Sequence, residues 1–328
     1  MGYRSLIRSI ESSARKSERD SIRRQNELER RRKAYEKMEE NDKAAFEVEE
    51  YESKVEQLIT MHQDCCEKVN WKKVVEKEPM IKPIYSSENE NAAKKILADY
   101  KPTILEKMLK KKYEFHIKEL NDNILTGIKN DEDNYASKME NYSRESIEHL
   151  KLVELAKKVL NGDKAGYIEA IKEFDPFSEL SNLGSSLKFS IKDEKNVNVE
   201  ILVKGDQAIP KQVKSLLKSG KLSIKDMPIG KFNELYQDYV CSAILRVGRE
   251  TFSLLPINSI IITAKAKMLD SSTGKLIEQP VLSALFQRET FDQIDFLKID
   301  PSDAMKNFKH SMGFKKTIGL SPVEPLSW

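Results

Sequence analysis

Glycine and proline are distributed very unevenly along the 328-residue chain. Only two of the 12 glycines, Gly2 and Gly127, precede residue 160, and only three of the 11 prolines precede residue 170. Long stretches that lack both residues and are rich in Glu, Lys, Arg and Ala favour helix. A stretch that contains both, together with apolar runs, is typical of a compact mixed domain. The sequence therefore predicts two parts that join near residues 174–177.

The second part has the alternation of apolar and polar residues that is typical of strands. Residues 187–191 and 197–203 alternate around a polar turn, and two apolar runs, 257–266 and 280–286, flank a second turn. Residues 232–255 have the apolar spacing of a long helix. We expect an α+β fold. Long N-terminal helices, arranged as a coiled coil or a helical hairpin, precede a compact α+β domain with antiparallel β-hairpins and one long central helix.

Three regions are expected along the chain. Residues 1–70 form a basic and acidic helical coiled-coil region, residues 71–175 form a further helical region, and residues 176–328 form the α+β domain. Shorter elements are predicted from local spacing and capping residues: helices at 88–100, 104–142, 146–160, 164–174 and 211–218, and a helical tail after a cap at Asp300.

An apolar seam marks the end of the first region. Its members are separated by four, three, four and three residues, which is coiled-coil spacing. They are Ala44, Val48, Tyr51, Val55 and Leu58. The seam covers about two heptads, fewer than the three to four that identify a coiled coil. Dimerisation and packing against a later helix of the same chain both fit it.

Charge is sorted along the same region, although the whole chain has a net charge of only +3. Residues 1–38 contain 12 basic and six acidic residues, whereas residues 39–57 contain eight acidic residues and two lysines. The basic block has few apolar positions, so it forms a solvated helix or an arm that a partner orders. We expect a protein partner or a second copy to bind its arginines: Arg23, Arg24, Arg30, Arg31 and Arg32.

A lysine cluster occupies residues 211–231, with six lysines against the single acidic residue Asp226. Lys211, Lys214 and Lys218 would share one face of the predicted short helix. Such an array suits the phosphate backbone of DNA or RNA, and the absence of interleaved aromatic residues disfavours stacking on single strands. A solvated helix and loop is the alternative. The predicted nucleic-acid-binding residues are Lys211, Lys214, Lys218, Lys221, Lys225, Lys231, Arg246 and Arg249.

Several classes of site and location are excluded or disfavoured. Phosphate-binding loops and the G-x-S-x-G nucleophile motif do not occur, and we expect no cofactor. Cys65 and Cys66 follow His62 and Asp64, but adjacent cysteines do not fit one tetrahedral ion, so we expect no metal site. Three cysteines cannot make a disulfide framework, which favours a reducing cytoplasm. No apolar run reaches about 18 residues, and the opening residues lack a signal sequence, so no membrane association is expected.

One polar constellation lies on the predicted long helix. Glu234, Gln237 and Asp238 share a face, and Arg246 and Glu250 are spaced to pair. If the protein were an enzyme, Glu234, Asp238 and Glu250 would be its catalytic residues and would bind Mg²⁺ or Mn²⁺ in a diverged nuclease. Otherwise they form a polar outer face, and no residue is catalytic.

The second half resembles a family of bacterial cytoplasmic proteins that has no known activity. The residues that carry this resemblance are 211–227 (KQVKSLLKSGKLSIKDM), 234–242 (ELYQDYVCS), 245–256 (LRVGRETFSLLP), 280–283 with Arg288-Glu289, and 300–305 with 314–316. The basic N-terminal region looks similar as well. The resemblance implies an architecture and a bacterial setting, and it implies no mechanism.

The order helix, strand, turn, strand also resembles the core of Mrr-type restriction-endonuclease-like domains. Those domains carry an acidic residue at the head of the first strand and Glu-x-Lys or Gln-x-Lys in the next. Here the first position is Asn258, and the second strand offers Ser283, Leu285 and Gln287 with Arg288. This resemblance implies a domain that is inactive as a nuclease and retains binding.

The leading hypothesis is therefore a non-enzymatic bacterial accessory or scaffold protein. It assembles through its helical half and binds a partner or nucleic acid through the lysine-rich segment, a build compatible with a phage-defence or mobile-element context. The alternative is a diverged, inactive nuclease domain of the Mrr type.

Overall fold

The computed structural model describes residues 40–177, 185–205, 208–270 and 272–328. These residues form two compact units. The first contains the described residues up to Lys73 together with Leu155–Trp328, and the second is Val74–Glu154. This division differs from the three consecutive regions expected from composition, because the segment before Lys73 packs on elements of the C-terminal half.

The first unit is built on a six-stranded sheet with the order β1-β2-β5-β6-β7-β8. Both expected hairpins are present, because β1 pairs with β2 and β5 pairs with β6 in antiparallel fashion. β2 and β5 pair in parallel, which joins the two hairpins into one sheet. The combination of this sheet with long helices confirms the expected α+β class. The strands are β1 (Ser186–Ile191), β2 (Asn196–Leu202), β5 (Ser259–Asp270), β6 (Lys275–Gln287), β7 (Lys309–Lys315) and β8 (Gly319–Ser321).

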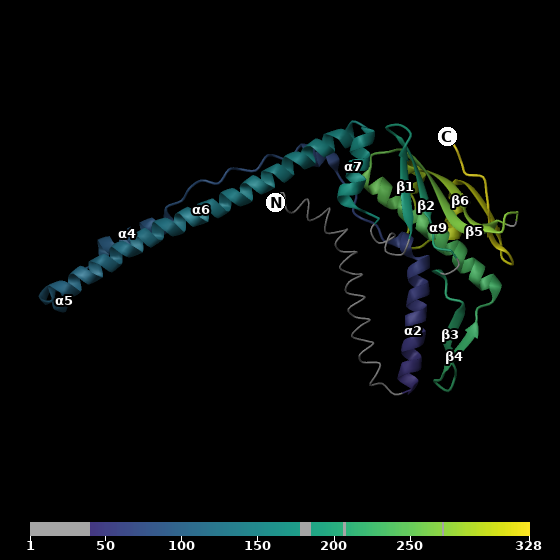
Figure 1. Cartoon of the computed structure of the whole chain (residues 1–328), viewed down its shortest axis with the longest axis horizontal. Coiled ribbons are helices and arrows are strands. Elements are labelled where there is room, and N and C mark those ends of the chain that lie inside the picture. Colours follow the sequence, from purple (N-terminus) through teal and green to yellow (C-terminus); the bar gives the residue numbers. More distant parts are fainter. Residues whose placement is uncertain (1–39, 178–184, 206–207, 271) are drawn as a thin grey trace. The chain divides into compact units, whose positions relative to one another are not determined.

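Helix α9 (Ile229–Leu254) is the expected long central helix. It precedes β5 in the chain and lies across one face of the sheet (Figure 1). The covered face is apolar, with Val199 of β2 directly opposite Ile262 of β5, and both side chains are almost fully buried. A Cβ on Gly248 would lie 3.0 Å from the Phe291 ring, so glycine lets α9 approach this core closely. Because α9 is buried along most of its length, it has neighbours on the side away from the sheet as well.

The opposite face of the sheet is covered by the C-terminal residues. Thr263 and Ser283 lie on that face with their hydroxyl oxygens 3.0 Å apart. The backbone N–H of Leu326 donates to Ser283 Oγ at 3.0 Å, and Trp328 Nε1 donates to Asn198 Oδ1 at 2.6 Å. Burial on both faces explains why residues 257–266 read as a continuous apolar run.

The predicted helix at residues 211–218 is wrong. Strands β3 (Gln212–Leu216) and β4 (Leu222–Asp226) form a separate two-stranded antiparallel ribbon. Gly220, in the turn between them, has φ of 81°, a left-handed conformation that glycine adopts without strain. The turn brings residues 222–226 back along residues 212–216, so backbone hydrogen bonds across the ribbon replace those of a helix.

Helix α2 (Glu40–Ile59) carries the predicted apolar seam, and the seam packs within the same chain. Ala44, Val48 and Leu58 are buried, and α2 contacts α9 and both strands of the ribbon. Glu47 of α2 accepts a hydrogen bond from Lys214 Nζ at 2.9 Å. The structure therefore shows the seam packed within its own chain, which is one of the two arrangements that the sequence allows.

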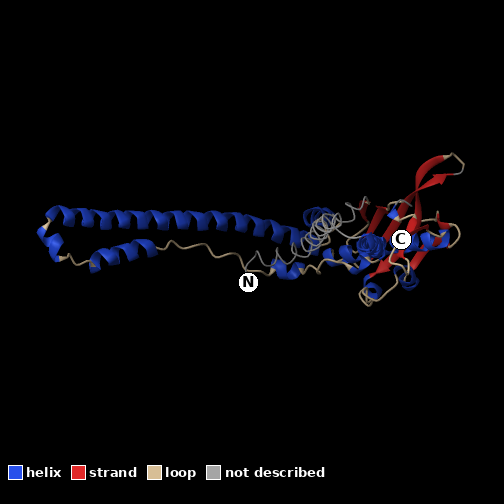
Figure 2. Cartoon of the chain, turned by 90° about the horizontal axis from the view of Figure 1, so that it is seen from below, coloured by secondary structure: helices blue, strands red, loops and turns tan. Residues whose placement is uncertain are grey.

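The second unit is a helical hairpin within residues 74–154 (Figure 2). Its outgoing arm contains α4 (Glu88–Asp99) and α5 (Ile104–Met108), and its return arm is α6 (Lys110–Leu160). Tyr85 stacks edge-on against Tyr135, and Tyr100 contacts His116, so the arms run antiparallel. The predicted break near residue 145 does not occur, because residues 142–146 contain no glycine or proline.

A carboxylate from one arm of this hairpin caps the helix of the other arm. Asp131 of α6 accepts hydrogen bonds from the backbone N–H groups of Asn89 and Glu90, at 3.1 and 2.9 Å. These groups belong to the first turn of α4, whose own N-cap residue, Ser87, makes no such bond. Burial opposes the charge on Asp131, but the bonds from Glu90 and Asn89 keep the pKa of its carboxyl below the ordinary value. The cap therefore fixes the register of the two arms.

Short elements complete the chain. Asp300 caps α11, as the sequence predicts, and Asp163 caps α7, because each side chain accepts two backbone N–H bonds. The predicted helical tail after Asp300 is wrong, since strands β7 and β8 follow two short helical segments. The remaining described elements are η1 (Met61–Gln63), α3 (Trp71–Val75), α7 (Lys164–Phe174), α10 (Arg288–Phe291), α11 (Pro301–Ala304) and η3 (Met305–Asn307).

Candidate functional site

The lysine cluster lies on and around the β3–β4 ribbon. Lys218 and Lys221 flank the turn at its tip, Lys225 lies on β4, and Lys211 and Lys231 lie near its base. All five are exposed, whereas Lys214 is half-buried and paired with Glu47 of α2. Figure 1 places the ribbon beside α2 and apart from the six-stranded sheet.

The lysines do not share one face, because the segment is not helical. Lys214 lies opposite Ile224 and Lys225 lies opposite Val213, and these two neighbouring pairs point to opposite faces of the ribbon. The expected alignment of Lys211, Lys214 and Lys218 is therefore wrong. The ribbon instead presents positive charge at its tip, at its base and on one face.

Arg246 and Arg249 belong to the predicted nucleic-acid-binding residues, but both are engaged inside the first unit. The Nε atom of Arg246 lies 2.8 Å from Glu250 Oε1. Arg249 donates to the carbonyl oxygens of His62 and Gln63, at 2.6 and 2.7 Å, and its guanidinium lies over the Phe296 ring. These contacts direct both guanidinium groups at the protein itself, which does not fit the expected role in binding a phosphate backbone.

The three acidic residues of the nuclease alternative are not brought together. Asp238 and Glu250 are 12 positions apart on α9, a rise of about 18 Å, which is too far for one metal ion. Glu234 is paired with Lys316 at 2.6 Å. Among the residues that the structure describes, no group of three or more His, Cys, Asp or Glu side chains is placed to bind a metal ion.

Asp238 is nevertheless an unusual carboxyl group. Burial raises its pKa to about 6, and the neighbouring carboxylates of Asp300 and Glu234 act in the same direction. A hydrogen bond that Ser302 donates to Asp238 lowers the pKa and partly offsets this rise. A carboxyl with such a pKa can exchange a proton near neutral pH. Its neighbours are further carboxylates and a serine hydroxyl, so the arrangement is a titratable acidic patch.

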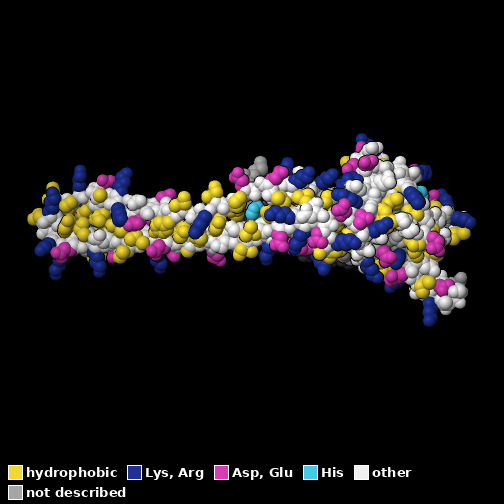
Figure 3. Space-filling view, turned by 90° about the horizontal axis from the view of Figure 1, so that it is seen from above, with side chains coloured by type: hydrophobic (Ala, Val, Ile, Leu, Met, Phe, Trp, Pro, Cys, Tyr) yellow, Lys and Arg dark blue, Asp and Glu magenta, His cyan; other side chains and the backbone are white. Residues whose placement is uncertain are grey.

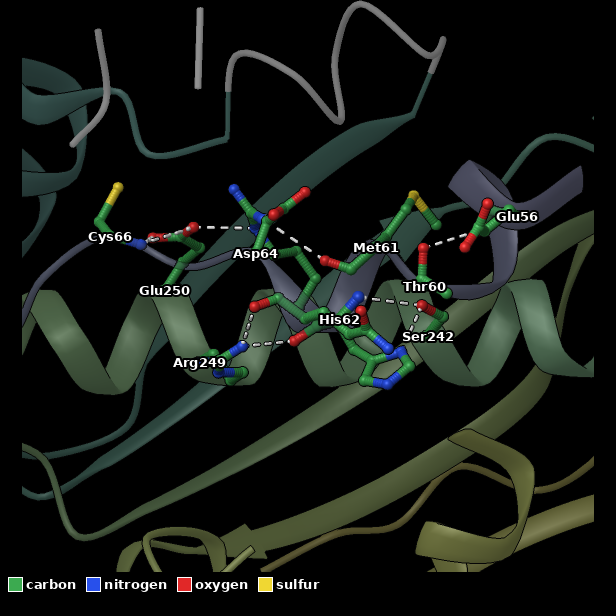
Figure 4. Close-up of polar contacts among 11 residues, drawn as sticks. Glu56, Thr60, Met61, His62, Asp64, Cys66, Ser242, Arg249 and Glu250 are labelled. Carbon is green, nitrogen blue, oxygen red and sulfur yellow. Dashed lines mark hydrogen bonds and ion pairs between the residues drawn. The ribbon is translucent and has the colours of Figure 1, made fainter. Parts of the chain in front are cut away.

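Figure 4 shows why the middle of α9 is so rich in polar side chains. The segment that contains η1 crosses α9, and the α9 side chains satisfy its backbone. His62 is the centre of this crossing: its backbone N–H donates to Ser242 Oγ at 3.0 Å, and its Nδ1 lies 2.9 Å from the same oxygen. Burial, and then the charge of Arg249, lowers the pKa of His62, so the imidazole is neutral at pH 7.

The histidine and serine do not form an accessible nucleophilic pair. Both side chains are almost completely buried. A nucleophile must reach its substrate, and a third group must orient the base. Their role is to fix residues 60–66 on α9, a contact between segments 180 positions apart that no sequence pattern signals.

The adjacent cysteines complete the same crossing. Burial raises the pKa of Cys65 to about 11, and burial together with the charge of Glu250 raises that of Cys66 as well. The backbone N–H of Cys66 donates to the two carboxylate oxygens of Glu250, at 3.3 and 3.2 Å. Both cysteines are thus protonated thiols, which are poor nucleophiles and poor metal ligands.

The positions that correspond to the nuclease motif also have structural contacts. The backbone carbonyl oxygen of Asn258, just before β5, accepts a hydrogen bond from the Arg288 N–H at 2.8 Å. Ser283 is fully buried and bonded to Thr263. Gln287 lies at the end of β6, opposite Ser259. These positions bring no pair of carboxylates together.

The predicted partner-binding arginines, Arg23, Arg24, Arg30, Arg31 and Arg32, lie outside the described residues. In the part of the chain that the structure describes, no helix is long and apolar enough to cross a membrane.

No protein family, no curated protein and no solved structure matches this chain. The comparisons therefore lend no support to the resemblance between its second half and a bacterial protein family, nor to the likeness to Mrr-type domains. Any assignment of function depends on the surfaces described above.

Proposed function

We propose that the protein is a non-enzymatic accessory protein that binds duplex nucleic acid through the β3–β4 ribbon. The observation that carries the proposal is the set of five exposed lysines on and beside a two-stranded ribbon that is separate from the main sheet. A two-stranded ribbon fits the major groove of B-DNA, and lysines on its tip and edge would lie against the phosphates on either side. Glu47 pairs with Lys214, and the other five lysines of the cluster are exposed.

Two features favour backbone contacts over base recognition. The ribbon offers Ser215 and Ser223 between its lysines but no Arg, Asn or Gln on the same face, and such side chains make most specific base contacts. In addition, lysine neutralises phosphates as a point charge without a preferred sequence. The expected binding is therefore tight at low salt, weak at physiological salt and insensitive to sequence.

Fluorescence anisotropy with a labelled duplex at 50 and 200 mM salt tests this proposal. Five lysine–phosphate contacts predict a slope of about −4.5 in a plot of log affinity against log salt, which is a loss of a few hundred-fold between the two salt concentrations. A variant with Lys218→Gln, Lys221→Gln and Lys225→Gln retains two contacts. Its slope should be shallower, about −1.8, and its affinity should fall only roughly tenfold between the two salt concentrations.

A matched control replaces three exposed lysines of the six-stranded sheet: Lys267→Gln, Lys275→Gln and Lys309→Gln. It removes the same net charge, so it should leave the slope near the wild-type value. No binding at 50 mM salt, or equal effects of the two triple variants, would contradict the proposal. Binding to an acidic protein instead of a duplex would point to the partner alternative.

The assembly part of the proposal no longer depends on α2, whose apolar seam is covered by the same chain. Assembly through the helical hairpin or the basic N-terminal residues remains proposed, and sedimentation velocity on the full chain tests it. A single monomeric species at all concentrations would reject it. The bacterial, cytoplasmic and phage-defence setting remains an expectation from the resemblance alone.

A further inference from the structure

The turn of the helical hairpin has an unusual surface. Where the outgoing arm meets α6, three large apolar side chains are almost fully exposed: Ile104 at 81%, Met108 at 79% and Phe115 at 72%. Leu109 and Tyr113 between them are also exposed. Figure 3 shows hydrophobic side chains gathered at the left-hand end, with basic side chains around them. We call residues 101–115 the hairpin tip.

The hairpin tip is strongly basic as well as apolar. Residues 101–115 contain five lysines and two acidic residues, Glu106 and Glu114. Every one of these lysines is exposed, and none forms an ion pair with another described residue: Lys101, Lys107, Lys110, Lys111 and Lys112. Glu106 accepts hydrogen bonds from Thr103 and lies 3.0 Å from His116, so its charge is used to stabilise the turn.

These two properties together select one kind of partner. Positive charge alone would suit any polyanion. The phosphate backbone of a duplex, however, offers no apolar surface to the exposed isoleucine and methionine side chains. A second copy of the tip would bring two basic surfaces together. The surface of an anionic bilayer presents negative headgroups directly above an apolar interior, and it needs no matching shape in the partner.

We propose that the hairpin tip docks on anionic lipid bilayers, with Ile104, Met108 and Phe115 inserted below the headgroups and the five lysines among the phosphates. Such peripheral docking requires no spanning helix. It differs from the sequence-based expectation of no membrane association, and it is independent of the proposed nucleic-acid surface, because the tip and the ribbon share no residue.

Co-sedimentation of the full-length protein with vesicles tests the proposal. Vesicles of phosphatidylcholine with about 30% phosphatidylglycerol should pellet the protein, and phosphatidylcholine alone should pellet much less. A variant with Lys110→Gln, Lys111→Gln and Lys112→Gln should lose roughly 100-fold in affinity, because each basic residue near such a surface contributes about a fivefold factor. A variant with Ile104→Ser and Met108→Ser should lose at least tenfold at unchanged charge.

Two controls separate the tip from other surfaces. Ile147→Ser with Leu150→Ser replaces two exposed apolar residues of α6 far along the arm from the tip, and it should bind vesicles as the wild type does. The ribbon variant with Lys218→Gln, Lys221→Gln and Lys225→Gln should also keep vesicle binding while losing duplex binding.

Three outcomes would overturn the proposal. The first is equal binding to both vesicle types, or to neither. The second is full vesicle binding by the Ile104→Ser/Met108→Ser variant, which would reduce the tip to a site of charge attraction. The third is oligomerisation that the tip substitutions abolish in the absence of lipid, which would identify a protein partner. Circular dichroism of each variant confirms that its helices are retained.

Discussion

The contact between Arg246 and Glu250 is buried more deeply than any other ion pair described in the structure, and it makes the sharpest prediction about stability. Their side chains are 6% and 0% exposed, and Nε of Arg246 lies 2.8 Å from Glu250 Oε1. Glu250→Gln keeps the shape but removes the charge. It leaves the guanidinium group buried without its carboxylate and weakens the bond that the Cys66 N–H donates.

Removing one partner of a buried pair costs about 3–5 kcal/mol, because the other charge stays desolvated. Arg246 keeps a contact with the Met61 carbonyl at 3.4 Å and lies 3.9 Å from Asp64, so we expect the lower end, about 3 kcal/mol. In a unit of this size that corresponds to a fall in Tm of roughly 6–12 °C. Urea denaturation followed by circular dichroism measures the change in the free energy of unfolding.

The control is Glu234→Gln on the same helix. Glu234 is paired with Lys316 at the similar distance of 2.6 Å, but both side chains are largely exposed, so the expected loss is below about 0.5 kcal/mol. The double variant Arg246→Met/Glu250→Leu removes both buried charges and should return to within about 1 kcal/mol of the wild type. Equal losses for Glu250→Gln and Glu234→Gln would refute the reasoning, as would a loss below 1 kcal/mol for Glu250→Gln.

Three further predictions concern single groups. Burial raises the pKa of Asp238 to about 6, above the ordinary value of 3.8, so the wild-type protein loses stability as the pH rises from 3.8 to 6. After discounting for solvent screening, Asp238→Asn should raise the free energy of unfolding by about 1–2 kcal/mol at pH 7.5 and leave it unchanged below about pH 3.5. Urea denaturation of both proteins at the two pH values measures the difference. Gly127→Ala places a Cβ 2.8 Å from the Asn89 carbonyl oxygen. The free energy of unfolding should therefore fall by about 1–3 kcal/mol, and amide exchange in α4 should become faster. A stabilised variant would contradict the close approach of the two arms. The pKa of Cys65 is raised from 9.0 to about 11. At pH 8 the native thiol should therefore be alkylated roughly 100-fold more slowly than the same thiol in the denatured chain. Comparable rates would show that the native site opens readily.

Elements with strong local signals were predictable from the sequence. Pro256 ends the long helix, Asp300 caps a short one, and the alternation around residues 193–196 defines the first hairpin. In each case residues that are close in sequence determine the structure, so the information is local.

The wrong predictions involve contacts between distant residues or weak local preferences. The lysines of residues 211–218 have helical spacing, but pairing with residues 222–226 outweighs that preference. No sequence pattern indicates the role of Ser242, because its partner His62 lies far away in the sequence. The parallel pairing of β2 with β5 and the cap that Asp131 places on α4 also join residues that are far apart in the sequence.

The candidate site was only partly predictable for the same reason. The lysine cluster was visible as composition, but its geometry was not, and the arginines of α9 were indistinguishable from surface residues. The hairpin tip gave a signal in the sequence Lys110-Lys111-Lys112, preceded by Met108 and Leu109. Its meaning depends on the turn, which exposes these residues together.

The antiparallel arms of the helical hairpin have a consequence for insertions and deletions. Tyr85 lies beside Tyr135, and outgoing residues 78–87, which belong to no helix, run alongside α6 (Figure 2). The outgoing residues are extended, at about 3.3 Å each, while α6 rises 1.5 Å per residue. One residue removed from the extended segment must therefore be matched by about two removed from α6. Homologous chains with shorter or longer hairpins should show this two-to-one exchange, with the Asp131 cap retained.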